Sequence, residues 1–295
     1  MIRQVARWLI FILAAVVFSL GGMAPLAMMI FPVPVAAFRA CDRFGAALGA
    51  MAVAGLTVTV GTGYPQLGLV AMLVAGVGWL AGIHLKKERS FGHCVATLAL
   101  GQYLFLALET AVFWQGTREA WRQYLDQQAE QVRQAGGESA EPFLSFIHWA
   151  QEHWAYLGFG IVFAGVLVIA VMQSCTIYRW LRQAPPEAGA PPLHGQFKTM
   201  RPSEWLVWLA IAAGVLGLAD YQWPNEVMRF ISWNLGIAVY ALYWLNGLGI
   251  AICALEAFGA SPFVVILGLG LLILSNMQVV LSGFGRSEES RVGKE

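Results

Sequence analysis

Charged residues are scarce in this sequence. Of its 295 residues only 12% are charged, whereas 58% are hydrophobic and the mean hydropathy is +0.64. A soluble domain carries roughly a quarter charged residues, so the composition excludes an ordinary soluble fold. The formal net charge of +1 also argues against a basic surface for nucleic acid.

Sequence motifs for catalysis and metal binding are missing as well. The chain contains no HExxH, no GxSxG, no P-loop and no GxGxxG after a strand. Its cysteines are far apart and form no CxxC pair, so we expect small buried thiols rather than disulfides or metal ligands: Cys41, Cys94, Cys175 and Cys253. The sequence therefore predicts a protein that is not an enzyme and has no cofactor or metal.

Long apolar runs dominate the chain between residues 8 and 284. Hydrocarbon offers the backbone no water to bond, so only helices and closed barrels span membranes, and runs that are continuous rather than alternating favour helices. The prediction is an all-α, polytopic membrane bundle of eight or nine transmembrane helices. Glycine and proline break the first run into two short helices. The expected spans are 8–38 (two helices), 45–60, 66–84, 91–113, 154–178, 203–218, 230–255 and 261–281.

The longest interruption of this pattern, residues 116–152, is rich in Gln and Glu. It places Trp121 and Leu125 four residues apart on one helical face, and Gly136 and Gly137 are expected to end that helix. We expect an extracytoplasmic amphipathic helix that rests on the outer leaflet or extends a span into water. A lid, or a docking surface for a partner, is the alternative.

Lysine and arginine in short loops predict the orientation, because basic residues are retained on the cytoplasmic side. Clusters in 3–7, 39–43, 86–89 and 179–201 fall on one side if the first run crosses the membrane twice. The sequence therefore predicts a multi-pass protein of the bacterial cytoplasmic (inner) membrane with a cytoplasmic N-terminus and the 116–152 segment outside.

The same pattern divides the chain into four parts. Residues 1–183 form an N-terminal transmembrane block that includes the 116–152 helix. The segment 184–202 is a cytoplasmic linker that begins rich in Pro and Ala, 203–284 is a three-span block, and 285–295 is a polar tail.

Glu109 is a candidate ligand-binding residue, because it sits in an apolar span. A carboxylate in lipid costs roughly 2.5 kcal/mol or more, which makes an intramembrane acid a functional candidate. The alternative is a glutamate that reaches the interface beside Trp114.

A second candidate group is aromatic and amide. Helical spacing lets these side chains line one cavity, or pack between spans with amide hydrogen bonds worth about 0.6 to 2 kcal/mol each. The group consists of Trp233, Asn234, Tyr240, Trp244 and Asn246.

Small residues at helical spacing let helices approach closely, either within the chain or against a partner subunit. Gly78 and Gly82 form one such pair. Candidate partner-interface residues are Gly45, Ala46, Gly49, Ala50 and Ala54, together with Trp121 and Leu125 of the polar segment.

Several stretches together carry a family resemblance over nearly the whole chain. They are Pro32-Val-Pro34 followed by Arg39, the span end from Gly76-Val-Gly78 to Lys87, the span entry Arg201-Pro202-Ser-Glu-Trp205-Leu-Val-Trp208, and Asn234 followed by Asn246-Gly247-Leu-Gly249. In their order they resemble the YybS-like family of predicted bacterial membrane proteins. That group has no assigned function and is similar in pattern to the substrate-binding S components of energy-coupling factor transporters.

The resemblance implies a helical bundle that captures a small vitamin-like or metal-like solute from outside. Such a bundle works with a membrane coupling subunit and cytoplasmic ATPases. The chain departs from the pattern after its last span, and the block after residue 184 exceeds the usual number of spans.

Two functions are open from the sequence. The chain binds a small solute for transport, or it is a non-catalytic scaffold or assembly subunit of a larger membrane complex, with the lipid bilayer as a partner in both cases. A polar cavity with Glu109 or Asn234 on its wall favours the first, and a solidly filled bundle favours the second.

Overall fold

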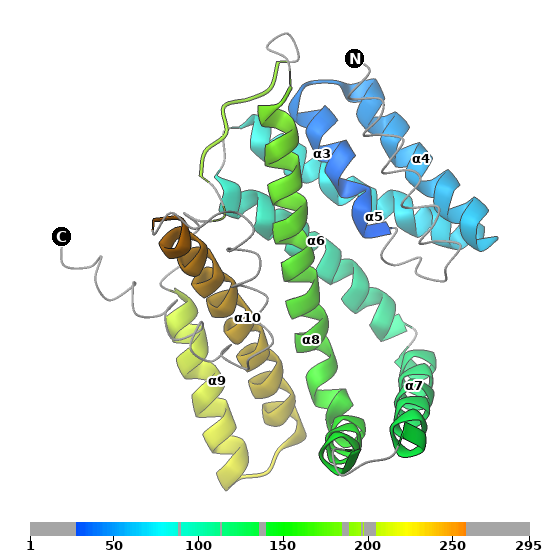
Figure 1. Cartoon of the computed structure of the whole chain (residues 1–295), viewed down its shortest axis with the longest axis vertical. Helices are drawn as coiled ribbons and strands as arrows, with labels where there is room; N and C mark the ends of the chain where they lie inside the picture. Colours follow the sequence, from blue (N-terminus) through cyan, green and yellow to red (C-terminus); the bar gives the residue numbers. More distant parts are fainter. Residues whose placement is uncertain are drawn as a thin grey trace, which may run out of the picture. The chain divides into compact units, whose positions relative to one another are not determined.

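The computed structural model describes the chain as helices, and no strand occurs within the described residues, which are 28–87, 90–112, 114–135, 140–184, 189–195, 197 and 205–257. Figure 1 shows the helices in chain order. They are α3 (Pro32–Ala40), α4 (Phe44–Thr62), α5 (Pro65–Lys86), α6 (Phe91–Val112), α7 (Trp114–Ala135), α8 (Ala140–Arg182), α9 (Trp205–Gln222) and α10 (Glu226–Ala257).

Six segments of these helices are long and apolar enough to cross a membrane: Phe44–Thr62, Pro65–Lys86, Phe91–Leu108, Leu157–Arg182, Trp205–Gln222 and Glu226–Leu255. Each corresponds to one of the six spans predicted between residues 45 and 255, so the all-α polytopic class is confirmed. The predicted total of eight or nine also counts 8–38 and 261–281, which lie partly or wholly outside the described residues.

The chain divides into two compact units, each assembled from segments that are discontinuous in sequence. The first unit takes 1–102, 166–202 and 243–295, and the second takes 103–165 and 203–242. Helices α6, α8 and α10 each contribute to both units. The units therefore do not coincide with the sequential blocks expected from the sequence, whose boundaries stay a prediction.

In the first unit, α3 and α5 approach each other closely through glycine. A turn at Phe31 interrupts the apolar helix, and Pro32 starts α3, where its missing N–H costs no helical bond. A β-carbon on Gly78 would collide with the Pro32 backbone, and one on Gly82 would lie 2.7 Å from the Ala36 carbonyl oxygen. The predicted proline break and the predicted Gly78–Gly82 approach are both present.

Helices α4 and α5 also touch through small residues, at a glycine pair outside the predicted ladder. A β-carbon on Gly68 would lie 2.6 Å from the Gly55 carbonyl oxygen. Ala50 and Ala54 are buried inside the chain, at 2% and 0% exposure. The other ladder residues, Gly45, Ala46 and Gly49, are exposed, so the ladder is split between two faces and the partner role of its exposed members stays a prediction.

Basic residues from the last turns of α3 and α5 meet at one carboxylate. Asp42 follows α3 in the left-handed region, with φ of 57°, a conformation that aspartate tolerates. Its carboxylate accepts hydrogen bonds from Lys86 Nζ at 2.7 Å and from Arg39 Nη1 at 3.1 Å. The Lys86 hydrogen bond, aided by Arg39, holds the pKa of Asp42 below its usual range.

A buried chain of amides ties α6 and α8 to the interrupted N-terminal helix. Gln102 Nε2 donates to Gln173 Oε1 at 2.8 Å, and Gln173 Nε2 donates to the Met29 carbonyl just before the break. Both glutamines are at least 95% buried. The Gln173 side chain therefore gives the Met29 carbonyl a hydrogen bond that the backbone of a continuous helix would have supplied.

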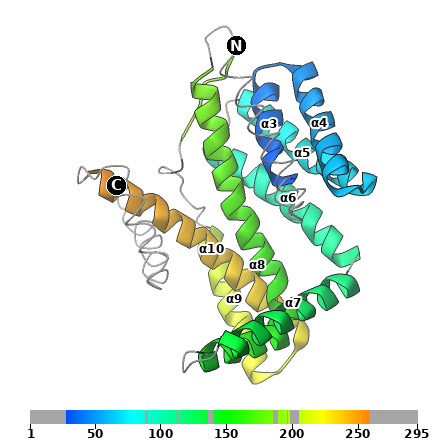
Figure 2. The same cartoon turned by 45° about the vertical axis from the view of Figure 1, so that its right-hand side comes forward.

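In the second unit, the polar segment forms two helical arms rather than one. Helix α7 is described as far as Ala135, and the glycine pair predicted to stop it lies outside the described residues. The first turns of α8 run back beside α7, as Figure 2 shows. Leu125 and Ala129 pack against Ile147 of α8, and Gln151 Nε2 donates to Asp126 at 2.8 Å.

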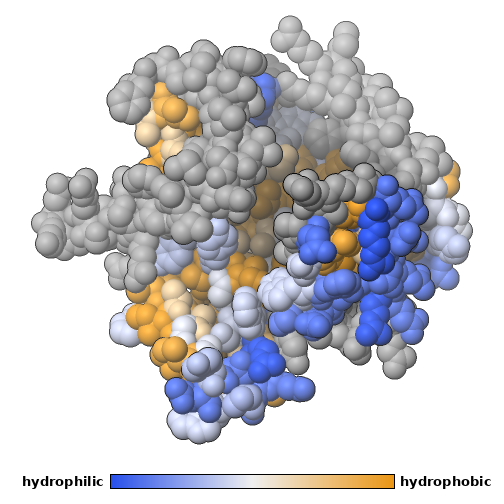
Figure 3. Space-filling view, turned by 60° about the horizontal axis from the view of Figure 1, so that its bottom comes forward, coloured by the Kyte–Doolittle hydropathy of each residue, from blue (hydrophilic) through white to orange (hydrophobic). Residues whose placement is uncertain are grey.

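Leu125 is consequently 7% exposed, and its side chain is already occupied within the chain. Hydrophilic residues gather over the outer side of this hairpin in Figure 3. The partner role of Leu125 stays a prediction, and a partner could reach this side chain only by displacing its contact with Ile147. The side chain of Trp121 lies outside the part of the chain that the structure describes.

Replacing Gly78 by alanine tests the α3–α5 contact. The added methyl group meets the Pro32 backbone, so we expect Gly78→Ala to lower the free energy of unfolding by about 1–3 kcal/mol, as overpacking does. Gly49→Ala is the matched control, since its β-carbon has open space and alanine favours helix by up to about 1 kcal/mol. Thermal unfolding in detergent measures both, and equal midpoints would contradict the close approach.

Replacing Asp42 by asparagine tests the charge cluster. A carboxyl whose pKa is lowered by folding contributes stability above its unfolded pKa of about 3.9, and this contribution is lost as pH falls through the folded-state value. We expect Asp42→Asn to unfold at lower temperature than wild type at pH 7, with the difference vanishing at acidic pH. A difference that does not change with pH would show that the charge plays no part.

Candidate functional site

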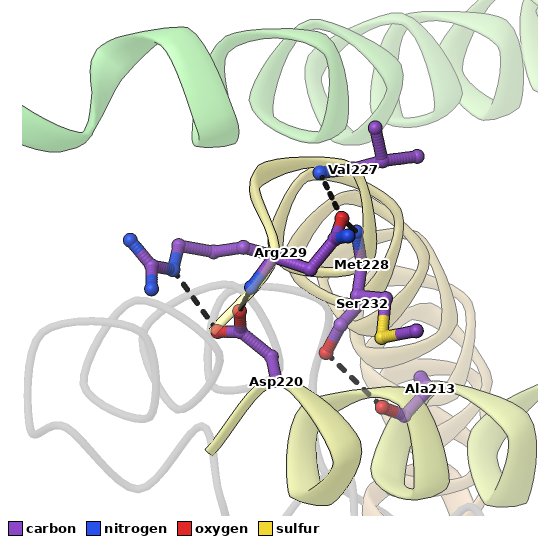
Figure 4. Close-up of polar contacts among 7 residues, drawn as sticks. Ala213, Asp220, Val227, Met228, Arg229 and Ser232 are labelled. Carbon is purple, nitrogen blue, oxygen red and sulfur yellow. Dashed lines mark hydrogen bonds and ion pairs between the residues drawn. The ribbon is translucent and has the colours of Figure 1, made fainter. Parts of the chain in front are cut away.

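The turn between α9 and α10 is fixed by the side chain of Asn225. Its Oδ1 accepts hydrogen bonds from the backbone N–H groups of Val227 at 2.9 Å and Met228 at 3.2 Å, as Figure 4 shows. These are donors that the first turn of a helix cannot satisfy by itself, and asparagine is among the preferred residues at this position. The cap sets where α10 begins.

An ion pair closes the same turn. Asp220 near the end of α9 accepts the backbone N–H of Asn225 at 2.9 Å with one oxygen, and Arg229 Nε at 3.0 Å with the other. The Asp220 side chain is 14% exposed and the Arg229 side chain 35% exposed. Pairing both carboxylate oxygens with donors makes this partial burial tolerable.

One turn further from the loop, α9 and α10 remain in contact. Ser232 Oγ donates to the Ala213 carbonyl oxygen at 3.1 Å (Figure 4). A β-carbon on Gly217 would lie 3.0 Å from the same hydroxyl oxygen, so glycine makes room for the serine. The two helices are thus joined at two levels, the ion pair and the serine.

Between α9 and α10 lies a cavity of about 680 Å³. Its polar wall is the Asp220–Arg229 pair with Ser232, and its remaining wall is aromatic, apolar or glycine. Substituted β-carbons on Gly214 and Gly236 would meet nothing within 4 Å, so both glycines face open space. The lining is Ala213, Gly214, Gly217, Asp220, Tyr221, Pro224, Arg229, Ser232, Trp233, Gly236, Ile237 and Tyr240.

Comparison with known protein families gives a match that covers nearly the whole chain. The profile of the family described as "Predicted membrane protein (DUF2232)" matches residues 8–285. The chain belongs to this family. Comparison with curated proteins and with solved structures found no match. Together with the six apolar helices, membership establishes an integral membrane protein.

In this DUF2232 chain, two of the predicted ligand-binding residues line the cavity. Trp233 and Tyr240 contribute to its α10 wall and are 43% and 39% exposed. Trp233 also lies edge-on to Trp149 of α8, with ring centroids 6.3 Å apart. The binding role of both residues stays a prediction, but the structure brings them together on one wall.

Asn234 points elsewhere. Its Oδ1 accepts the backbone N–H of Gly160 in α8, and its Nδ2 donates to the Phe230 carbonyl at 2.7 Å. Phe159 and Phe230 pack edge-to-face beside it, with centroids 5.7 Å apart. The Asn234 side-chain amide therefore forms a hydrogen bond between two spans, α8 and α10. This is the packing alternative of the sequence analysis.

Two other candidates, Trp244 and Asn246, are not among the residues that line this cavity. Trp244 and Asn246 belong to the first unit, where Asn246 is 8% exposed. Glu109 lies in α6, but its side chain is outside the described residues.

Sequence reasoning missed Asp220, Arg229 and Ser232 as cavity residues. An acid at the end of an apolar span is ordinarily explained by solvation at the membrane interface, so Asp220 carried no signal of its own. The usable signal was the pair of opposite charges on either side of the Pro224 turn, which a hairpin brings face to face.

Removing the Asn225 cap tests how the DUF2232 site is held. We expect Asn225→Ala to lower the free energy of unfolding by about 1 kcal/mol, because two backbone donors lose their acceptor. Asn225→Ser keeps a capping oxygen and should retain most of that stability. Thermal unfolding measures the difference, and two variants of equal stability would argue against the cap.

Proposed function

We propose that this protein is a small-solute-binding subunit of a membrane transport system, and that the α9–α10 cavity is its binding site. The observation that carries the proposal is the cavity of about 680 Å³ with an ion pair on its wall. Small-molecule sites typically measure about 300–1,000 Å³ and combine apolar and aromatic walls with a few placed polar groups. The cavity fits this description in size and lining.

The charged groups favour binding over simple packing. Asp220 and Arg229 lie in or beside helices apolar enough to span a membrane, where charged side chains are costly and tend to mark substrate pathways. Their pairing also defines one polar end of an otherwise apolar cavity. A solute with both polar and apolar parts can satisfy both.

The proposed partners follow from the resemblance to YybS-like proteins and to S components. The sequence has no nucleotide-binding motif, so energy for transport would come from cytoplasmic ATPases through a membrane coupling subunit. In this proposal the chain itself is non-catalytic and resides in the bacterial inner membrane.

The orientation proposed for the chain gains support from contacts in the first unit. Arg39 and Lys86 meet at Asp42, which places the basic C-terminal ends of α3 and α5 at one end of this unit. In the connector after α8, the His194 carbonyl accepts the Phe91 N–H at 2.9 Å and the Tyr178 hydroxyl at 3.1 Å. Basic residues retained on one side of the membrane would put these segments in the cytoplasm.

A scaffold role is the second candidate. Only 11% of the membrane-spanning window of α9 is buried within the chain, and large apolar side chains such as Trp205 and Trp208 are exposed on it. Such a surface suits lipid or a helix of another membrane protein. The two roles differ in whether the cavity holds a solute.

Native mass spectrometry of the gently solubilised wild-type complex tests the proposal. We expect a retained small molecule that is lost from Gly236→Leu, whose larger side chain fills the cavity. Gly165→Leu, at another glycine with open space around it, is the matched control and should retain the molecule.

Partner subunits without any small molecule would favour the scaffold. A small molecule that survives Gly236→Leu would remove the α9–α10 cavity from the binding site.

A further inference from the structure

The cavity is long, and its polarity changes along its length. Its α10 wall runs from Arg229 to Tyr240, which at 1.5 Å per residue corresponds to about 16 Å. The ion pair with Asp220 occupies the end at the turn. The α10 residues beyond Ser232 are Trp233, Gly236, Ile237 and Tyr240, and they are mostly apolar.

At the polar end, the more accessible charge is positive. Both oxygens of Asp220 are engaged, one by the Asn225 N–H and the other by Arg229 Nε, and its side chain is 14% exposed. The Arg229 side chain is more exposed, at 35%. A ligand entering at the turn would therefore meet the guanidinium rather than the carboxylate.

The apolar end continues along the two membrane-spanning helices. Gly214 and Gly236 leave space where other residues would place side chains, so this end is a channel wide enough for added carbon atoms. At the turn, Tyr221 and Trp223 are 81% and 73% exposed, which is typical of aromatic side chains at a membrane interface. The polar end thus corresponds to headgroup depth and the apolar end to hydrocarbon depth.

We propose that the ligand of this cavity is an amphiphile with an anionic head, a carboxylate or a phosphate, and an apolar tail. The head lies at Arg229 and the tail extends past Gly236 towards Tyr240. This inference rests on the proposed function, because it names the class of solute for the same site. A membrane lipid and a free fatty-acid-like solute share this chemistry.

Tryptophan fluorescence of the full-length protein tests the proposal, with a bromine-substituted fatty acid as the probe. Bromine quenches indoles that it touches, and Trp233 lies on the cavity wall. We expect saturable quenching in wild type, with a component that is absent from Trp233→Phe. Gly236→Leu, which blocks the tail, and Arg229→Gln, which removes the head contact, should each weaken binding at least about tenfold.

Three controls separate the parts of the ligand and of the protein. Gly165→Leu should bind the probe as wild type does. A brominated alkane without a head and butyrate without a long tail should each bind at least about tenfold more weakly than the whole probe. A brominated phospholipid in nanodiscs identifies a lipid as the source if it quenches Trp233, and a free solute if only the fatty acid does.

The outcomes also separate this inference from the proposed function. Quenching that is unaffected by Gly236→Leu and Arg229→Gln would overturn the assignment of head and tail. If a water-soluble molecule is retained in a Gly236-dependent manner while the brominated fatty acid fails to quench, the amphiphile is wrong and solute binding stands. If neither binds, both proposals fail.

Discussion

Backbone hydrogen bonding inside an apolar environment is the constraint on which this structure depends. Hydrocarbon offers no partner to an unpaired N–H or C=O group, so each interruption of a spanning helix needs a substitute. At the break before Pro32, the substitute is the Gln173 amide, which donates to the Met29 carbonyl. At the exposed turn between α9 and α10, the Asn225 side chain likewise accepts two backbone donors of the first helical turn. In both places a polar side chain completes the backbone hydrogen bonding where a helix is broken or begins.

Close approach of helices is the second means by which the fold is held together. Gly78 and Gly82 bring α3 against α5, and Gly55 and Gly68 bring α4 against α5. Lipid is as apolar as leucine, so backbone proximity and packing replace the hydrophobic drive that a soluble core would use. Where glycine has no neighbour, as at Gly214 and Gly236, the absent side chain leaves a cavity instead. The consequence of a glycine thus depends on what lies opposite it.

The candidate site combines these two features. The Asp220–Arg229 pair and the Asn225 cap fix the turn, and the glycines behind it keep the space between α9 and α10 open. A rigid polar end and an open apolar end are what a site needs to orient an amphipathic ligand. The family assignment establishes the membrane context of this arrangement, and the cavity supplies the reason to propose a bound solute.

The sequence by itself determined the all-α membrane class, six spans and the break at Pro32, because each depends on local composition or helical spacing. It also marked Gly78 and Gly82 as a site of close helix approach, but only the structure showed that α3 of the same chain is what approaches. Only the tertiary structure decided which face of each helix is used. It turned Asn234 towards Gly160 and placed Trp233 and Tyr240 on a cavity wall, although all three residues lie on one helix. It likewise buried Ala50 while leaving Ala46 exposed. An apolar span is hydrophobic on every side, so its sequence carries little information about rotation, and the neighbouring helices set it.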